Sequence, residues 1–224
     1  MITHTKEPQY DRCLELADQR RSEFGLMSNQ VWHDDPRRLG FVLARYKFVS
    51  KMFSGMNRVL EVGCADAFGT RVMCQEVKEL TAIDFDPVFV EDVNRRMDPT
   101  WPFECFTHDM LSGPVKGPFD GAYAVDVIEH INAEDEDRFV GNMVKSLGPH
   151  GVCILGSPLL ESQTYASPGS KAGHVNCKSG GDFCSLMARY FHNVFLFSMN
   201  DEVVHTGYHK MAHYLFAIGS DRRA

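Results

Sequence analysis

The sequence predicts an α/β protein with a doubly wound, mostly parallel seven-stranded sheet and helices on both faces. From residue 58 to residue 156, short apolar runs with strand character alternate with amphipathic stretches at helical spacing, the pattern of repeated βαβ units. Because βαβ crossovers are right-handed, such a chain winds its helices onto both faces of one sheet. Two further strand-like runs follow toward the C-terminus and bring the expected strand count to seven.

The expected strands are short apolar runs bounded by turn residues, at 58–62, 80–84, 102–106, 119–125, 151–156, 193–199 and 209–218. The expected helices have apolar residues at spacings of three and four, at 36–53, 69–78, 87–96, 134–147 and 181–190. Residues 157–181 interrupt this alternation with many glycines, serines and prolines. We therefore expect a long, mobile loop there that closes over the ligand crevice as a lid.

Length and composition describe a soluble globular protein. Of the 224 residues, 44 % are hydrophobic and 24 % charged, values that suit one domain at 36–224 preceded by an N-terminal helical cap segment at 1–35. No apolar run reaches the roughly 18 residues that span a bilayer. The N-terminus also lacks the apolar core of a signal peptide. We expect a cytoplasmic protein without membrane contact.

The charge balance bears on the class of partner. The formal net charge is −7 with no dense basic run, whereas proteins that bind nucleic acids use many Lys and Arg side chains on phosphates. Nucleic acid is therefore not the expected partner. One face of helix 36–53 does carry several cations, which we interpret as a solvated face with an anion-binding face as the alternative: Arg37, Arg38, Arg45, Lys47 and Lys51. The seven cysteines contain no Cys-x-x-Cys pair, which favours reduced, buried thiols.

The clearest functional pattern lies in residues 58–69, which predict a buried strand, a glycine turn and the start of a helix. Gly63 has no side chain, so the backbone there can approach a ligand closely. A dinucleotide site would need glycines where the chain has Ala65 and Phe68, so that interpretation fails. The next strand ends in Asp84, whose carboxylate can accept hydrogen bonds from both hydroxyls of a ribose.

Four segments together resemble the class I S-adenosylmethionine-dependent methyltransferases. They are Glu61-Val-Gly-Cys-Ala65, Ile83-Asp-Phe-Asp86, Thr107-His-Asp-Met110 and Phe119 to Ile131, and the likeness covers roughly residues 55 to 160. The resemblance implies S-adenosylmethionine as cofactor, a class I methyltransferase domain at 36–224 and an antiparallel last strand. Ala65 and Ala67 replace two glycines of the family, which a close turn tolerates if φ stays negative.

The resemblance also implies which residues bind the cofactor: Glu61, Gly63, Cys64, Ala65, Asp84, Phe85, Asp109, Met110 and Asp126. By this resemblance, Gly63 lies near the methionine part of the cofactor and Asp109 reaches the adenine amino group. Met110 and Phe85 pack on the adenine ring. Asp126 meets either the ammonium of the cofactor or the acceptor.

His174 and His130 are the predicted catalytic residues. His174 lies in the expected lid, and its unperturbed pKa near 6.5 suits proton removal at neutral pH. Asp126-x-x-Glu129-His130 has a second interpretation, because together with His174 it offers oxygen and nitrogen ligands for a metal. Some members of the family that methylate catechol-like or RNA-end hydroxyls carry such a metal cluster. We expect no metal here, since a Glu-His pair also begins a helix in members that bind none.

The sequence thus predicts methyl transfer from S-adenosylmethionine to a small-molecule acceptor, such as a sugar, a phenolic compound or another secondary metabolite, at a hydroxyl group. A homodimer is left open. The alternatives are a methyltransferase of RNA or protein that uses the basic face of helix 36–53, and a non-catalytic protein that binds S-adenosylmethionine without turnover.

Overall fold

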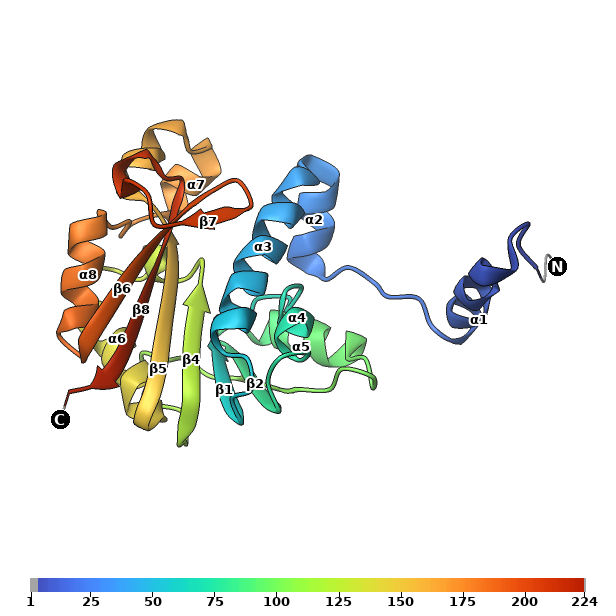
Figure 1. Cartoon of the computed structure of the whole chain (residues 1–224), viewed down its shortest axis with the longest axis horizontal. Helices are drawn as coiled ribbons and strands as arrows, with labels where there is room; N and C mark the ends of the chain where they lie inside the picture. Colours follow the sequence, from blue (N-terminus) through green and yellow to red (C-terminus); the bar gives the residue numbers. More distant parts are fainter. Residues whose placement is uncertain (1–3, 224) are drawn as a thin grey trace.

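The computed structural model describes residues 4–223, and its centre is a single eight-stranded sheet of order β3-β2-β1-β4-β5-β8-β6-β7 (Figure 1). The strands are β1 Arg58–Val62, β2 Glu79–Asp84, β3 Glu104–Thr107, β4 Phe119–Val125, β5 Leu147–Pro158, β6 Phe191–Asn200, β7 Val203–His205 and β8 Tyr214–Arg222. The first five are parallel, so their carboxyl ends meet at one edge. The predicted α/β fold class is confirmed.

The last strand, β8, runs antiparallel between β5 and β6, with Leu155 opposite Ala217 on one side and Leu196 opposite Ala217 on the other. The antiparallel last strand predicted from the resemblance is confirmed. The predicted count of seven strands is wrong by one, because β7 pairs with the end of β6. A strand of three residues is too short to show an alternation in sequence. The last predicted strand also starts late, since residues 209–211 form the 3₁₀ helix η4 (His209–Met211).

Helices cover both faces of the sheet (Figure 1). The described α-helices are α1 Asp11–Gln19, α2 Leu26–Asp34, α3 Arg37–Met52, α4 Thr70–Met73, α5 Pro87–Arg96, α6 Glu136–Ser146, α7 Pro168–Gly173 and α8 Gly180–Ala188. On one face, buried side chains of α6 and α8 such as Phe139 and Phe183 belong to one apolar core. On the other, α3 and α4 contribute Tyr46, Val49 and Met73 to a second core. The helix expected at 69–78 is only the single turn α4.

The segment after β5 is more regular than the sequence predicts. Instead of an open loop, it contains the 3₁₀ helix η3 (Leu160–Tyr165) and helix α7. Ser167 caps α7 by accepting a hydrogen bond from the amide of Ser170 at 3.1 Å, and Pro168 fills the first helical position. The expected loop structure is therefore wrong, whereas the expected closing motion stays a prediction.

The two N-terminal helices, α1 and α2, pack differently. Helix α1 has no buried residues and lies away from the body of the protein at the end of an extended linker (Figure 1). Helix α2 packs beside α3 and close to the turn after β1. Within residues 4–223, no helix has the length and apolar character needed to cross a membrane.

Candidate active site

The turn after β1 is shaped by Gly63. Its φ of 75° is in the left-handed region, and a Cβ atom there would lie 2.5 Å from Cγ2 of Val127. The amides of Gly63 and Cys64 both donate to the carbonyl of Ile83 at the end of β2, at 2.8 and 3.0 Å. Only glycine fits this position, and the turn is thereby held against the neighbouring strand.

The two alanines that follow adopt a glycine-like conformation. Ala65 has a φ of 46° and Ala67 a φ of 54°, so the expectation of negative φ is wrong. For a residue with a side chain, this region costs about 1–2 kcal/mol. The amide of Ala65 donates to Oδ2 of Asp84 at 2.8 Å, a charge-assisted hydrogen bond that offsets part of the strain.

Asp66, between those alanines, has a structural role that sequence reasoning missed. Its side chain is buried and Oδ2 accepts hydrogen bonds from the amide and the hydroxyl of Ser28 in α2, at 2.6 and 2.7 Å. The guanidinium of Arg96 donates to its carbonyl oxygen at 2.8 Å. The only signal in the sequence is a charged residue among small ones in a tight turn. Asp66 thus ties the N-terminal helix α2 to the turn.

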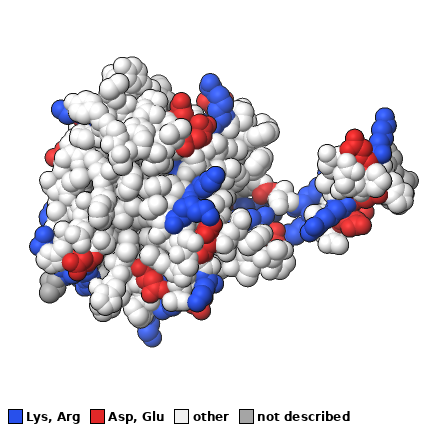
Figure 2. All heavy atoms as spheres, viewed as in Figure 1, with Lys and Arg blue, Asp and Glu red and all other residues white. Residues whose placement is uncertain are grey.

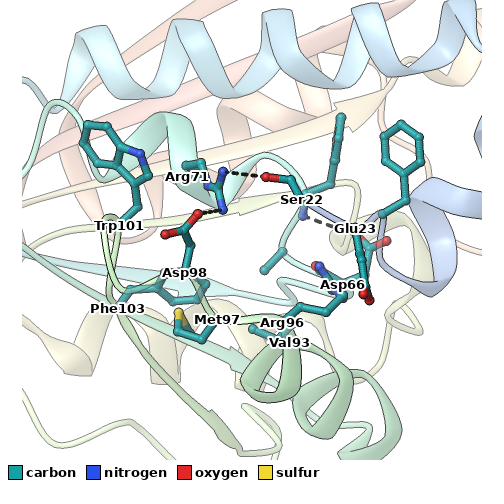
Figure 3. A pocket seen from close by; sticks show the side chains of 13 residues that line it. Ser22, Glu23, Asp66, Arg71, Val93, Arg96, Met97, Asp98, Trp101 and Phe103 are labelled. Carbon is teal, nitrogen blue, oxygen red and sulfur yellow. Dashed lines mark hydrogen bonds and ion pairs between the residues drawn. The ribbon is translucent and has the colours of Figure 1, made fainter. Parts of the chain in front are cut away.

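A hollow of about 360 Å³ lies beside this tie, between the linker at 22–24, the turn and residues 93–103 (Figure 3). Arg71 spans part of it, and donates to the hydroxyl of Ser22 at 3.5 Å and to the carboxylate of Asp98 at 2.9 Å. Arg71 is thus paired with Asp98 and also bonded to Ser22, so the contacts across this hollow hold the linker in place. It is separate from the cavity at the ends of β1 and β2.

That second cavity, of about 610 Å³, is in the size range of small-molecule sites. It is lined by six of the predicted site residues, Gly63, Asp84, Phe85, Asp109, Met110 and His130. Six further residues, most of them apolar, complete it: Val62, His108, Leu111, Val127, Ile131 and Phe139. Five of these six directly adjoin a predicted residue in sequence, which is the signal that would have found them.

The polar and aromatic groups of this cavity suit an adenosine ligand. The carboxylate of Asp84 is fixed by the amides of Ala65 and Asp86, at 2.8 and 3.0 Å, which leaves further lone pairs for hydroxyl groups. Phe85 is 73 % exposed and offers an open aromatic face, whereas Met110 is buried. Oδ1 of Asp109 accepts a hydrogen bond from the amide of Leu111 at 2.8 Å, which orients its carboxylate.

Several predicted cofactor residues lie outside the cavity lining. Glu61 is buried beneath the turn and accepts a hydrogen bond from the hydroxyl of Tyr46 at 2.6 Å, and burial raises its pKa. Cys64 is also buried, and a hydrogen bond with Cys105 together with burial raises the pKa of its thiol. Ala65 contributes its amide to Asp84 and does not line the cavity.

Asp126, at the end of β4, is held by an arginine from α3. Its φ of 60° is in the left-handed region, and its Oδ2 accepts a hydrogen bond from Nη1 of Arg45 at 2.5 Å. The guanidinium of Arg45 also lies 4.0 Å from the centre of the Tyr214 ring, a cation–π contact. The sequence places Arg45 on a solvated face, so this pair is a tertiary contact that the helix pattern does not reveal.

The predicted catalytic histidines lie together beside the cavity. The ring centres of His130 and His174 are 5.2 Å apart, and ligand atoms of these two residues and of Glu129 lie within 4.8 Å of one another. His130 is exposed and lines the cavity, whereas Glu129 is only 1 % exposed. Burial, and then the charge of Asp126, raise the pKa of Glu129 well above its usual range. Burial and the neighbouring His130 lower the pKa of His174, which favours a neutral imidazole.

Comparison with known proteins adds a second line of evidence. Residues 59–151 match a family described as "Methyltransferase domain". The chain is 26 % identical over 141 residues to nodulation protein S of Rhizobium tropici, which is 60 % of this chain and 59 % of that protein. It is 23 % identical over 139 residues to the ubiquinone biosynthesis O-methyltransferase of Psychrobacter arcticus, again 60 % of this chain and 53 % of the relative. The chain thus spans a little over half the length of these curated relatives.

The fold has close counterparts among solved structures. The N-methyltransferase NodS from Bradyrhizobium japonicum, in complex with S-adenosyl-L-homocysteine, superposes with a TM-score of 0.60 at 21 % identity. That match covers 84 % of this chain and 89 % of NodS. The match of residues 59–151 agrees with the predicted methyltransferase domain, and the superposition agrees with the predicted fold. Residues 59–151 thus match the methyltransferase-domain family, in agreement with the resemblance carried by the motifs at the ends of the first, second and fourth strands.

Proposed function

We propose that the protein transfers the methyl group of S-adenosylmethionine to a hydroxyl group of a small-molecule acceptor. The observation that supports this most is the position of His130, which lines the cofactor cavity on one side and adjoins His174 and Glu129 on the other. An acceptor held against these side chains would lie next to the cofactor. Methyl transfer is an in-line displacement that depends mainly on such positioning.

The roles of the cofactor residues follow from this proposal. Asp84 binds the ribose, Gly63 lets the backbone approach the methionine part, and Phe85 and Met110 hold the adenine between an open and a buried surface. Glu61 and Cys64 support the turn from beneath, and Asp126 orients the acceptor side through Arg45. A cytoplasmic location and a homodimer stay predictions.

The charges of α3 argue against RNA or protein as the acceptor. Three of its five cations are engaged with carboxylates, since Arg37 pairs with Asp35, Arg45 with Asp126 and Lys51 with Glu76. Figure 2 shows acidic and basic side chains interspersed on this view of the molecule, without one continuous basic surface. A nucleic acid would find few free cations here, because its affinity depends on many phosphate contacts.

The buried carboxylate of Glu129 also argues against a protein that binds the cofactor without turnover. Glu129 is buried with both carboxylate oxygens lacking a hydrogen-bond partner, and such burial destabilises the fold. Unfavourable arrangements of this kind are concentrated at catalytic sites. A protein that only binds S-adenosylmethionine, through Asp84 and Gly63, would not need a buried carboxylate such as that of Glu129.

The test is to incubate the purified protein with methyl-labelled S-adenosylmethionine and separate small-molecule, RNA and protein fractions of a cell extract. We expect label in the small-molecule fraction, on an ether oxygen when the product is identified by mass spectrometry. Label confined to RNA or protein would contradict the acceptor class, and label on nitrogen would contradict the hydroxyl. Cofactor binding without label in any fraction would support the non-catalytic alternative.

A further inference from the structure

The carboxylate of Glu129 is the most unusual buried group in the described part of the chain. It belongs to the 3₁₀ helix η2 (Ile128–His130), is 1 % exposed, and neither oxygen has a hydrogen-bond partner. A carboxylate removed from water requires either a proton or a cation as compensation. The guanidinium of Arg45, whose charge acts on this carboxylate, bonds to Asp126 and stacks on Tyr214 instead.

Two histidines present nitrogen atoms to this carboxylate. Nδ1 of His130 lies 2.9 Å from the carbonyl oxygen of Gly173, and Nδ1 of His174 lies 2.8 Å from Oε1 of Gln163. A carbonyl oxygen only accepts, so each Nδ1 carries the hydrogen and each Nε2 keeps a lone pair. The amide nitrogen of Gln163 donates to the carbonyl of Leu159 at 3.3 Å, which fixes the orientation of this amide. Histidines fixed through Nδ1 in this way are typical of metal ligands.

The backbone brings these groups together from distant parts of the chain. The amides of Val175 and Asn176 both donate to the carbonyl oxygen of Glu129, at 2.8 and 3.0 Å. These bonds hold the residue next to them, His174, against η2 while leaving the carboxylate of Glu129 free. His174 ends α7 and Glu129 follows β4, so the site forms only when the segment after β5 is folded over.

We propose that Glu129, His130 and His174 bind one divalent transition-metal ion, with coordination positions left open toward the cofactor cavity. Two imidazoles and one carboxylate suit ions such as Zn²⁺ or Mn²⁺ better than Mg²⁺ or Ca²⁺, which prefer oxygen ligands alone. His130 is exposed and lines the cavity, so the ion has a path of entry. This assignment departs from the expectation of the sequence, which favoured a site without metal.

The role of the ion rests on the proposed function. The acceptor hydroxyl binds at an open position, where the ion lowers its pKa and its proton passes to water. The methyl group then moves from the sulfonium to this oxygen. The carbon–oxygen bond forms as the carbon–sulfur bond breaks, and the electron pair stays on sulfur. His174 holds the ion and does not take the proton, because its Nε2 lone pair is engaged.

Metal binding is tested without any activity. The full chain is stripped with a chelator and titrated calorimetrically with Zn²⁺ and with Mn²⁺, with bound metal counted by mass spectrometry. We expect one ion per chain for at least one of these metals. Glu129→Gln and His174→Ala should each weaken binding at least 10-fold. Gln163→Ala should weaken it roughly 10-fold through loss of the Nδ1 partner.

Two controls separate loss of the site from loss of the fold. His192→Ala changes an exposed histidine of β6 and should leave metal binding unchanged. All variants should bind S-adenosyl-L-homocysteine as the unchanged protein does, because Asp84 and the Gly63 turn are intact. Failure of the stripped protein to bind either ion at one per chain would overturn the site. Equal binding by His174→Ala and the unchanged protein would also overturn it.

The proposed role of the ion in catalysis is tested separately from metal binding. Activity that survives complete chelation would overturn the role of the ion and return His174 to the position of general base. An ion bound as expected in a protein that methylates no acceptor would leave the metal site standing while the proposed function fails.

Discussion

The turns after β1 and β4 lie at the same edge of the sheet and both contain residues with positive φ, yet their polar groups are satisfied in different ways. In the turn after β1, the amide of Ala65 and the carboxylate of Asp66 have partners within the fold. At the turn after β4, both oxygens of Glu129 lack a partner, and so does Nε of Arg45, which reaches this turn from α3. Beneath the first turn one oxygen of Glu61 lacks a partner, whereas at the second turn both oxygens of the Glu129 carboxylate do. We infer that the cofactor half is preorganised and the acceptor half is finished by what it binds.

Gly63→Ala should have the largest effect, because the new methyl group meets Val127 and the φ of 75° is unfavourable for alanine. We expect a loss of about 2–4 kcal/mol in the free energy of unfolding, measured by urea denaturation, together with loss of cofactor binding. Gly55→Ala is the matched control, with a φ of 83° but open space around its Cβ. It should cost only about 1–2 kcal/mol. Equal losses in both variants would show that the contact with Val127 relaxes.

Asp84→Ala should weaken binding of S-adenosyl-L-homocysteine by about 1.5–3 kcal/mol, the range for hydrogen bonds to a charged group. Calorimetry measures the change directly. Asp86→Asn is the control, since asparagine keeps an acceptor for the amide of Val88 at the start of α5. An unchanged affinity in Asp84→Ala would mean that the ribose is bound elsewhere.

Glu61→Gln tests the support beneath the first turn through pH. Burial raises the pKa of Glu61 in the folded protein above its ordinary value of 4.5. The folded state therefore holds its proton more tightly, so stability from this group is full below about pH 4.5 and is lost as pH rises through the raised pKa. Each unit of raised pKa corresponds to about 1.4 kcal/mol at neutral pH. The melting temperature of Glu61→Gln relative to that of the unchanged protein should therefore rise from pH 4 to pH 8. A difference in melting temperature that does not change with pH would contradict this.

Ala67→Gly should have the smallest effect and an unusual sign. Glycine relieves about 1–2 kcal/mol of left-handed strain at a φ of 54° but loses part of this to the greater entropy of the unfolded chain. A net gain of about 0.5–1 kcal/mol in unfolding free energy is expected. Ala44→Gly in helix α3 is the control, and it should lower the free energy of unfolding by about 1 kcal/mol. Destabilisation at both sites would argue that Ala67 is not strained in solution.

Local patterns in the sequence predicted the parallel half of the sheet, and they predicted which residues lie at its edge. Gly63 directly follows β1 and Asp84 is the last residue of β2, so strand position alone places them together. His130, which follows β4 closely, lines the same cavity as Asp84 and Gly63. Such predictions succeed where function depends on a residue's position relative to the end of its own strand.

Contacts between distant segments were beyond the sequence. The pairs Arg45–Asp126 and Ser28–Asp66 depend on how helices pack across the sheet edge, which helical spacing does not determine. The positive φ of Ala65 was missed because Asp84 overrides the preference of alanine. β7 was missed because it depends on its pairing with β6 rather than on its own three residues.

The position of β8 has a consequence for how the protein is made. This strand follows the other seven strands of the sheet in sequence, yet it lies in the interior of the sheet between β5 and β6. Until residues 214–222 emerge from the ribosome, both neighbours present unpaired backbone edges, which are templates for aggregation. The growing sheet is therefore vulnerable until β8 has been made, and a chaperone that covers these two edges would be needed only until β8 inserts.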